Sequence, residues 1–184
     1  NIIVGAGSEY LIMLLGLLLG NRNIAVENPG YIKAKEIFKS MAWNVIGIDM
    51  DIEGMDINIL DSKNADICYL MPANQYPTGV IMPINRRREL IAWCYRGEDR
   101  YIIEDDYLAD FDSKRELTFH YLDDSQHVIY IKSFSASLFP ALRITALLLP
   151  SDIQSAFIAY KKAVDYDSNL IMQKALSLYI DNLM

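Results

Sequence analysis

NIIVGAGSEYLIMLLGLLLGNRNIAVE, residues 1–27, is the stretch from which the fold class follows. The short apolar run at residues 1–5 predicts a β-strand, and the longer apolar run at residues 8–19 predicts a helix. Residues 23–27 predict a second strand. A strand, a helix and another strand in succession form the repeating unit of a parallel sheet that is covered by helices. The apolar character of both strands suits burial on both faces of such a sheet.

The same alternation continues through the rest of the chain. Further strands are predicted at residues 44–49, 65–71, 101–105, 127–132 and 143–150, and further helices at 31–41, 84–94, 151–163 and 169–183. We therefore expect one α/β domain over residues 1–184, with three α/β/α layers and a mostly parallel, mixed sheet. Ligands of such sheets bind at the carboxyl ends of the strands, so the residues that follow each strand are the candidates for chemistry.

Composition limits the classes of function. The 184 residues are 52% hydrophobic and 22% charged, which is typical of a globular protein in water. A net charge of −7 argues against nucleic-acid binding by this part of the protein, because phosphate contacts need a basic surface. The basic run Arg86–Arg88 is expected on the solvated face of its helix. Two cysteines and two histidines, with no CxxC, favour the reducing cytoplasm and argue against a zinc site or any other metal centre.

The first predicted strand is followed by GAGSEY, residues 5–10, which leads directly into a helix. Free N–H groups and the helix dipole at such a terminus suit an anion, most often a phosphate. A tight turn with Ser8 as the N-cap is an alternative. A dinucleotide-binding fingerprint is another, because Gly5 and Gly7 fit its first two positions and Glu27 falls at the end of the next strand. Tyr10 occupies the third glycine position of that fingerprint.

Aromatic, amide and acidic side chains follow later strands. Tyr31 comes after a Pro–Gly turn, where its ring is available as a stacking face. The loop at residues 71–79, MPANQYPTG, has a path constrained by proline and presents amide groups. The acidic run in EDDY, residues 104–107, is costly to bury without a positive partner, which a protonated ring nitrogen would supply. A helix N-cap with solvated acids is the alternative for this run.

The segment KSFSASLFPALRI, residues 132–144, follows the strand predicted at 127–132. Its Ser133 and Ser135 provide hydroxyl groups, and Arg143 provides a guanidinium. Hydroxyls and an arginine together form a good binding site for a phosphate group.

Taken together, these segments resemble the fold-type I, pyridoxal-phosphate-dependent aminotransferases of class I/II. They are most similar to the aminotransferase-like domain of MocR-type regulators in the GntR family. The motifs ENPGY, NQYPTG, IIEDDY and FSASLFPALRI occur in the expected order, and the resemblance covers nearly the whole chain. It implies that residues 1–184 are the large domain that binds pyridoxal 5'-phosphate (PLP).

The resemblance also implies where the cofactor phosphate binds. Backbone N–H groups of the turn around Ser8 would point at the phosphate, and hydroxyl and guanidinium groups after the strand at 127–132 would complete the site. Family members often have glutamine in place of Glu9, so no side-chain contact is carried over to that residue. The residues implied in phosphate binding are Gly7, Ser8, Glu9, Ser133, Ser135 and Arg143.

Other residues would contact the pyridine ring. The resemblance implies that Tyr31 stacks on the ring and that Asp105 pairs with the ring nitrogen and keeps it protonated. Tyr107 would donate a hydrogen bond to the phenolic oxygen of the ring. Asn74 or Gln75 would line the same edge.

The chain departs from the family pattern at Ala136. The family sequence Phe-Ser-Lys here reads Phe134-Ser135-Ala136, and a methyl group cannot replace the lysine that forms the Schiff base and shuttles a proton. A natural loss and an engineered replacement both fit this pattern. Lys132 is not expected to substitute, because its side chain should leave a different part of the strand. We expect PLP to be held non-covalently or as an external aldimine with a free amino acid, and transamination to be absent.

The sequence thus predicts the PLP-binding effector domain of a MocR/GntR-type transcriptional regulator. The resemblance implies a DNA-binding winged helix before residue 1, a small domain after residue 184 and a homodimer in the full-length protein. DNA would be bound only through the winged helix, and no membrane association is expected. A fragment of a class I/II aminotransferase whose lysine was lost or mutated is the main alternative, and a dinucleotide-binding module is a remote one.

Overall fold

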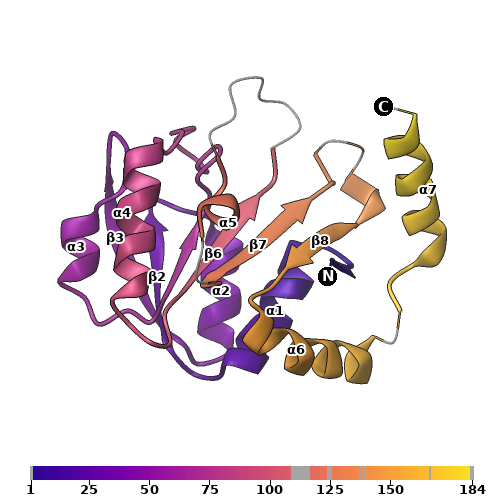
Figure 1. The fold of residues 1–184 in the computed structure, drawn as a ribbon, viewed down its shortest axis with the longest axis horizontal. Coiled ribbons are helices and arrows are strands. Elements are labelled where there is room, and N and C mark those ends of the chain that lie inside the picture. Colours follow the sequence, from indigo (N-terminus) through magenta and orange to yellow (C-terminus); the bar gives the residue numbers. More distant parts are fainter. Residues whose placement is uncertain are drawn as a thin grey trace.

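The chain folds around one mixed sheet with the strand order β1-β8-β7-β6-β5-β2-β3-β4 (Figure 1). The computed structural model describes residues 2–108, 117–123, 126–136, 138, 140–165 and 167–182. The strands are β1 (Ile3–Gly5), β2 (Asn23–Asn28), β3 (Asn44–Asp51), β4 (Gly54–Met55), β5 (Ile67–Leu70), β6 (Tyr101–Asp106), β7 (Val128–Ser133) and β8 (Thr145–Leu148).

The pairing of the strands confirms the predicted fold class. Strands β3, β2, β5, β6 and β7 form a continuous parallel block. The strands β1, β8 and β4 add antiparallel pairs at the two edges. Because β6 lies between β5 and β7, residues at its carboxyl end have neighbours on both sides.

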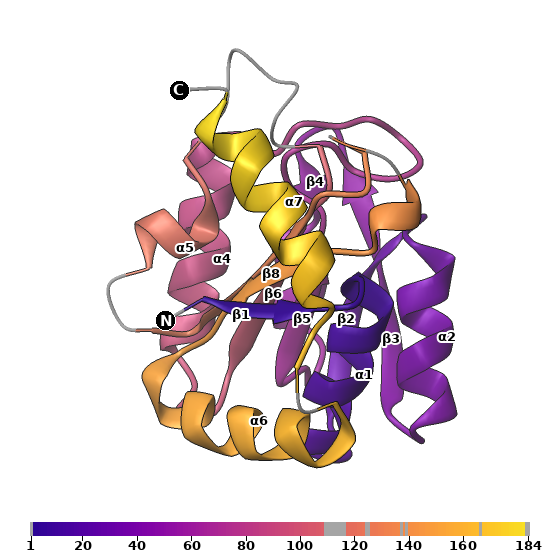
Figure 2. The ribbon, with the colours of Figure 1, turned by 90° about the vertical axis from the view of Figure 1, so that its right-hand side faces the viewer.

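Helices cover both faces of the sheet. They are α1 (Ser8–Leu19), α2 (Ile32–Ser40), α3 (Ile57–Asp61), α4 (Ile84–Tyr95), α5 (Phe119–Leu122), α6 (Ser151–Val164) and α7 (Leu170–Asp181), with a short 3-10 helix η1 (Pro140–Leu142). Figure 2 shows α4 and α5 on one side of the sheet and α1 and α2 on the other. The sequence did not predict β4, α3, α5 or η1, which are too short to show a hydrophobic period. The predicted ends at residues 1 and 183 lie outside the described residues.

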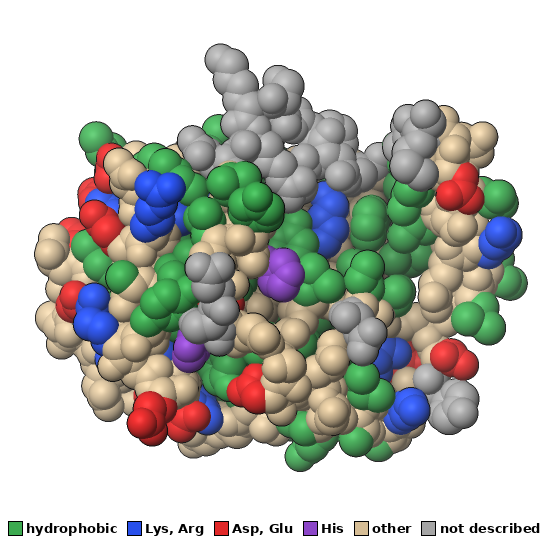
Figure 3. All heavy atoms as spheres, viewed as in Figure 1, with side chains coloured by type: hydrophobic (Ala, Val, Ile, Leu, Met, Phe, Trp, Pro, Cys, Tyr) green, Lys and Arg blue, Asp and Glu red, His purple; other side chains and the backbone are tan. Residues whose placement is uncertain are grey.

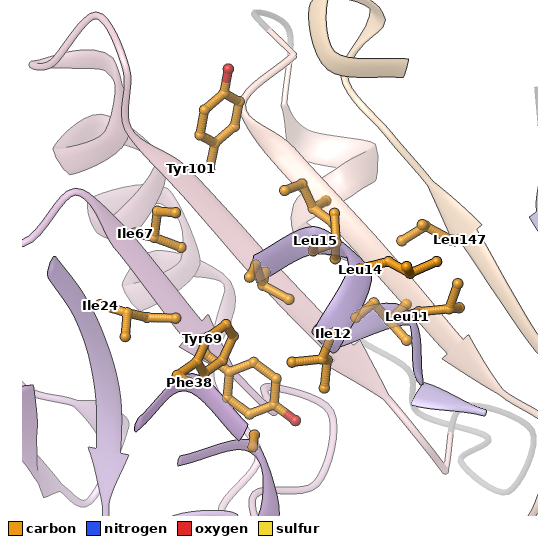
Figure 4. Close-up of a cluster of buried hydrophobic side chains, with 14 of the residues drawn as sticks. Leu11, Ile12, Leu14, Leu15, Ile24, Phe38, Ile67, Tyr69, Tyr101 and Leu147 are labelled. Carbon is orange, nitrogen blue, oxygen red and sulfur yellow. The ribbon is translucent and has the colours of Figure 1, made fainter. Parts of the chain in front are cut away.

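Two hydrophobic cores result from this layering. Side chains of α1 such as Leu11 and Leu15 are fully buried, in one cluster with residues of the sheet such as Leu147 (Figure 4). The second core packs α3, α4 and α5 against the opposite face. The longest apolar run of the sequence is therefore an internal helix. No helix in the described part of the chain is long and apolar enough to cross a membrane.

The arginines of α4 are not a solvated face, which corrects the prediction for two of the three. Arg87 is only 1% exposed and donates hydrogen bonds to three backbone carbonyls, at 3.0–3.1 Å. Its guanidinium also lies 3.7 Å from the buried carboxylate of Glu104 on β6. Arg86 is buried as well and pairs with Asp51 at 2.7 Å. Only Arg88 is exposed. The buried Glu104 carboxylate on the sheet is thus compensated by a cation from the helix that covers it.

Helix α7 differs from the other helices because none of its side chains is buried. Large hydrophobic residues remain at its surface, as the right edge of Figure 3 shows. The most exposed of them are Leu170, Ile171 and Leu178. A hydrogen bond of 2.6 Å from the Ser168 hydroxyl to the Val4 carbonyl connects the segment before α7 to β1.

We predict that Arg87→Met destabilises the protein by about 3 kcal/mol at pH 8, because removal of one partner leaves a buried charge uncompensated. Burial raises the pKa of Glu104 to about 7. The penalty should therefore be smaller at pH 5.5, where the Glu104 carboxyl takes up a proton. Urea unfolding at both pH values measures the change. Arg88→Met is the matched control and should leave stability within about 0.5 kcal/mol of the parent; equal effects of the two substitutions would contradict the role given to Arg87.

Candidate functional site

A cavity of about 340 Å³ opens at the carboxyl ends of the central strands, beside the N-terminus of α1. This volume lies within the usual range for ligand pockets, roughly 300–1,000 Å³. Its position agrees with the rule that α/β sheets bind ligands at their carboxyl edge. The lining residues are Ser8, Glu9, Tyr31, Lys33, Met71, Tyr76, Asp105, Tyr107, Ser133, Ser135 and Arg143. Eight of the residues predicted from the sequence are among them.

The other predicted residues lie next to this lining or away from it. Gly7 has a φ of +109°, a backbone conformation that favours glycine, and it passes close to the flexible Arg143 guanidinium, 2.1 Å from where a Cβ atom would lie. Asn74 donates a hydrogen bond of 3.2 Å to the Tyr107 hydroxyl. Ala136 is exposed in the turn that follows β7 and is not part of the lining.

Gln75 is not part of the cavity lining, and its hydrogen bonds hold the loop at residues 71–79 in place. It is 2% exposed and donates hydrogen bonds to the carbonyls of Pro29 and Tyr76, at 2.9 and 2.7 Å. Its carbonyl oxygen accepts from the backbone N–H and the hydroxyl of Thr78. Neither of the two amides that the sequence offered for the ligand edge belongs to the cavity lining. The Asn74 amide contacts the hydroxyl of the lining residue Tyr107, whereas the Gln75 amide is taken up by backbone carbonyls.

Three consecutive carboxylates at the end of β6 are buried, which contradicts the alternative of solvated acids. Neighbouring residues of a strand point to opposite faces. Glu104 and Asp106 therefore share the α4 side, where Arg87 and the Tyr130 hydroxyl meet them, the latter at 2.6 Å. Asp105 points to the α1 side, where it lines the cavity.

Asp105 is a buried carboxylate of the cavity lining that is only partly compensated. The Tyr69 hydroxyl donates a hydrogen bond of 2.5 Å to its Oδ2. Its Oδ1 is buried and has no hydrogen-bond partner among the residues that the structure describes. Burial raises the pKa of Asp105 to about 7, against the lowering effect of the Tyr69 hydrogen bond. A ligand that offers a cation or a donor to Oδ1 would therefore be favoured here.

Tyr69 is one residue of the candidate site that sequence reasoning missed, because it contacts Asp105 from outside the lining. It lies inside β5 and packs in the core beside Phe38, with ring centroids 6.2 Å apart (Figure 4). A tyrosine in an otherwise apolar strand was the available signal, because a buried hydroxyl almost always needs a hydrogen-bond partner. Lys33, in the first turn of α2, was missed as well, and nothing in its sequence context distinguished it from a surface lysine.

The other side of the cavity is suited to an anion. Gly7, not Ser8, is the N-cap of α1, so the alternative in which Ser8 is the N-cap is wrong. The N–H groups in the first turn of a helix have no partners within the helix and attract negative charge. Hydroxyls of Ser133 and Ser135 and the guanidinium of Arg143 line the same cavity. These groups together can bind a phosphate.

Glu9 and Tyr31 close this side of the cavity. The Glu9 carboxylate pairs with Arg143 at 2.7 Å and accepts a hydrogen bond of 3.1 Å from the Tyr31 hydroxyl. The Tyr31 ring meets the ring of Tyr76 edge-on, with centroids 6.2 Å apart. Tyr31 therefore presents an aromatic wall that a bridge to Glu9 holds in place.

The geometry argues against the dinucleotide-binding alternative. That alternative needs Glu27 free to bind a ribose. Glu27 is instead buried and accepts hydrogen bonds from the Met71 N–H and the Gln75 amide, both at 3.3 Å. Its carboxylate thus joins two loops of the chain.

Comparisons with known proteins place this arrangement among regulators and aminotransferases. No protein-family model matches the chain. It is 34% identical over 188 residues to YcxD of Bacillus subtilis (strain 168), an uncharacterized HTH-type transcriptional regulator, with 98% of this chain and 42% of that protein covered. It is 27% identical to the "Probable rhizopine catabolism regulatory protein MocR" of Rhizobium meliloti, with 97% of this chain and 37% of that protein covered.

The fold has close counterparts among solved structures. The crystal structure of Pyrococcus horikoshii kynurenine aminotransferase matches with a TM-score of 0.91 and 28% identity over 99% of this chain and 48% of that one. The chain spans less than half the length of each of these three proteins.

We predict that Asp105→Asn stabilises the ligand-free protein at alkaline pH. The folded pKa of about 7 lies above the ordinary value of 3.8. The stability that Asp105 contributes is therefore present below pH 3.8 and is lost as the pH rises through 7. The variant should exceed the parent by about 3 kcal/mol at pH 8 and by much less at pH 4.5. Urea unfolding at the two pH values measures the gap, and a gap that does not change with pH would contradict the assignment.

Proposed function

Because this chain is an aminotransferase-like domain homologous to MocR-type transcriptional regulators, we propose that it is the PLP-binding effector domain of such a regulator. The observation that supports this most is the pairing, in one cavity, of a buried carboxylate with a phosphate-binding group of residues. Asp105 Oδ1 has no partner among the described residues, and Arg143 with Ser133 and Ser135 lines the same space. PLP carries a basic ring nitrogen and a phosphate, which match these two features.

The residues of the chain would divide the work of binding. Asp105, oriented by Tyr69, would pair with the ring nitrogen and hold a proton on it. Tyr31 would cover one face of the ring. Tyr107, joined to Asn74, would donate to the phenolic oxygen. When bound, the cofactor supplies an aldehyde that reacts with amines and a ring that withdraws electrons.

Ala136 makes this a site for sensing and not for transamination. No amine is present at the position where the family has its lysine. Lys132 is not part of the cavity lining; its register partner on β6 is Asp106, and its ammonium lies 5.6 Å from the centroid of the Phe134 ring. The chain would therefore hold PLP without a covalent bond, and a free amino acid could react with the aldehyde in place of the lysine.

A fragment of a class I/II aminotransferase with an altered lysine is the second candidate. The TM-score of 0.91 to the kynurenine aminotransferase, which was solved in complex with PMP, favours it. The two candidates differ in the complete protein. A winged-helix segment before residue 1 belongs to the regulator, which would bind DNA through that segment and work in the cytoplasm. Both candidates include a small domain after residue 184.

We expect the full-length protein to be a homodimer. Helix α7 exposes apolar side chains, among them Leu170 and Ile171. An exposed apolar surface of this kind is typical of a contact with another protein surface. Sedimentation of the full-length protein at micromolar concentration should therefore show a dimer. A single monomeric species at that concentration would contradict this expectation.

We predict that the chain as it stands binds PLP reversibly and that Ala136→Lys converts this into a covalent, borohydride-reducible adduct. The physical reason is that a lysine at this position would bring a primary amine to the bound aldehyde. Peptide mapping after reduction, on both forms, locates the adduct. Transaminase assays of the parent chain should show no turnover.

Two outcomes would contradict the proposal. A reduced adduct on Lys33 or Lys132 of the parent chain would show that another amine takes the aldehyde. Bound PLP without an adduct in Ala136→Lys would show that the aldehyde does not lie at residue 136. Asp105→Asn is the control for cofactor binding, and it should weaken the affinity for PLP while leaving the fold intact.

A further inference from the structure

Glu9 engages both cationic side chains of the cavity lining. Its Oε2 lies 2.7 Å from the Arg143 guanidinium, and its Oε1 lies 3.8 Å from the Lys33 ammonium. The Tyr31 hydroxyl donates to Oε1 as well, at 3.1 Å. The positive charge that would attract a phosphate is therefore already paired with a carboxylate of the chain.

Separating the Glu9–Arg143 ion pair costs little free energy, because both side chains are partly accessible to water. The side chains of Arg143 and Glu9 are 49% and 27% exposed. Ion pairs of this kind are weak and are screened by salt. Burial raises the pKa of Glu9, but its hydrogen bonds to Arg143, to the backbone and to Tyr31, together with the charge of Arg143, outweigh burial, and the net pKa lies below the ordinary value. The carboxylate is thus charged at neutral pH and stands beside the place of an incoming phosphate.

We infer that Glu9 is an affinity-setting residue whose carboxylate competes with the ligand phosphate for Arg143. Every anion that enters must displace Glu9 from Arg143 and remain close to its negative charge. An anion without further contacts, such as inorganic phosphate, is held poorly as a result. A phosphate ester whose ring also meets Asp105 and Tyr31 has additional contacts and stays bound.

What the inference says about PLP rests on the proposed function. What it says about inorganic phosphate rests only on the contacts of Glu9 and Arg143. Glutamine has the same shape and can still accept a hydrogen bond from the Tyr31 hydroxyl, but it has no charge with which to hold Arg143. Glu9→Gln therefore removes the competition without removing the wall of the cavity.

Two titrations of the chain test the inference, with inorganic phosphate and with PLP as probes. Calorimetry at low ionic strength should show that Glu9→Gln binds both probes about tenfold more tightly than the parent does. Arg143→Ala should bind both more weakly. In the Arg143→Ala background, the gain from Glu9→Gln should shrink to about threefold or less, because the contested guanidinium is gone. Glu36→Gln, an equal change of charge at an exposed position of α2 outside the cavity lining, should leave both affinities unchanged.

The outcomes separate this inference from the proposed function. Equal phosphate affinity of the parent and Glu9→Gln would overturn the competition, even if PLP binds. Tighter phosphate binding by Glu9→Gln with no PLP binding by any form would support the competition and overturn the PLP site. If Glu9→Gln raises the affinity equally in the parent and in Arg143→Ala, Glu9 acts only by repelling the anion. That result would also overturn the competition for Arg143. Absence of binding of both probes to every form would overturn both proposals.

Discussion

The burial of three adjacent carboxylates at the end of β6 is the constraint on which the rest of the structure depends. Each acid is costly to remove from water unless a partner compensates it. Arg87 from α4 approaches Glu104, and the Tyr130 hydroxyl from β7 meets Asp106. Both partners lie on one face of the sheet. Asp105 alone points to the other face, where Tyr69 satisfies one oxygen and the cavity meets the other.

Strand order converts this constraint into a binding site. Because β6 lies between the parallel strands β5 and β7, the loops that follow all three strands begin at one edge of the sheet. The loop after β5 brings Asn74 to Tyr107, and the end of β7 brings Ser133 to the cavity. Arg143 lies two residues before the start of the antiparallel β8 at Thr145. This position brings its guanidinium beside Gly7 at the N-terminus of α1. Acidic and anion-binding groups thus share one small space.

Binding and catalysis are separable in this site. The groups that would recognise a ring and a phosphate are in place, whereas Ala136 supplies no amine for covalent chemistry. Glu9 pairs with Arg143, and we have proposed that this pair disfavours anions without ring contacts. A domain that must report the presence of a ligand benefits from reversible and selective binding, and it has no need of turnover. This combination is the one that we propose for an effector domain.

The sequence by itself determined the α/β class, the long helices and strands and most of the residues that line the cavity, because hydrophobic period and strand-end motifs are local. It did not predict the short β4, α3 and α5, nor the burial of Arg87. It also missed the hydrogen bond from Tyr69 to Asp105 and the pair of Glu9 with Arg143, whose members are 36 and 134 residues apart. Local patterns show which face a side chain occupies. Only the tertiary structure decides which polar and charged side chains come into contact on that face. Such contacts depend on strand order and on the distance between elements that are remote in sequence.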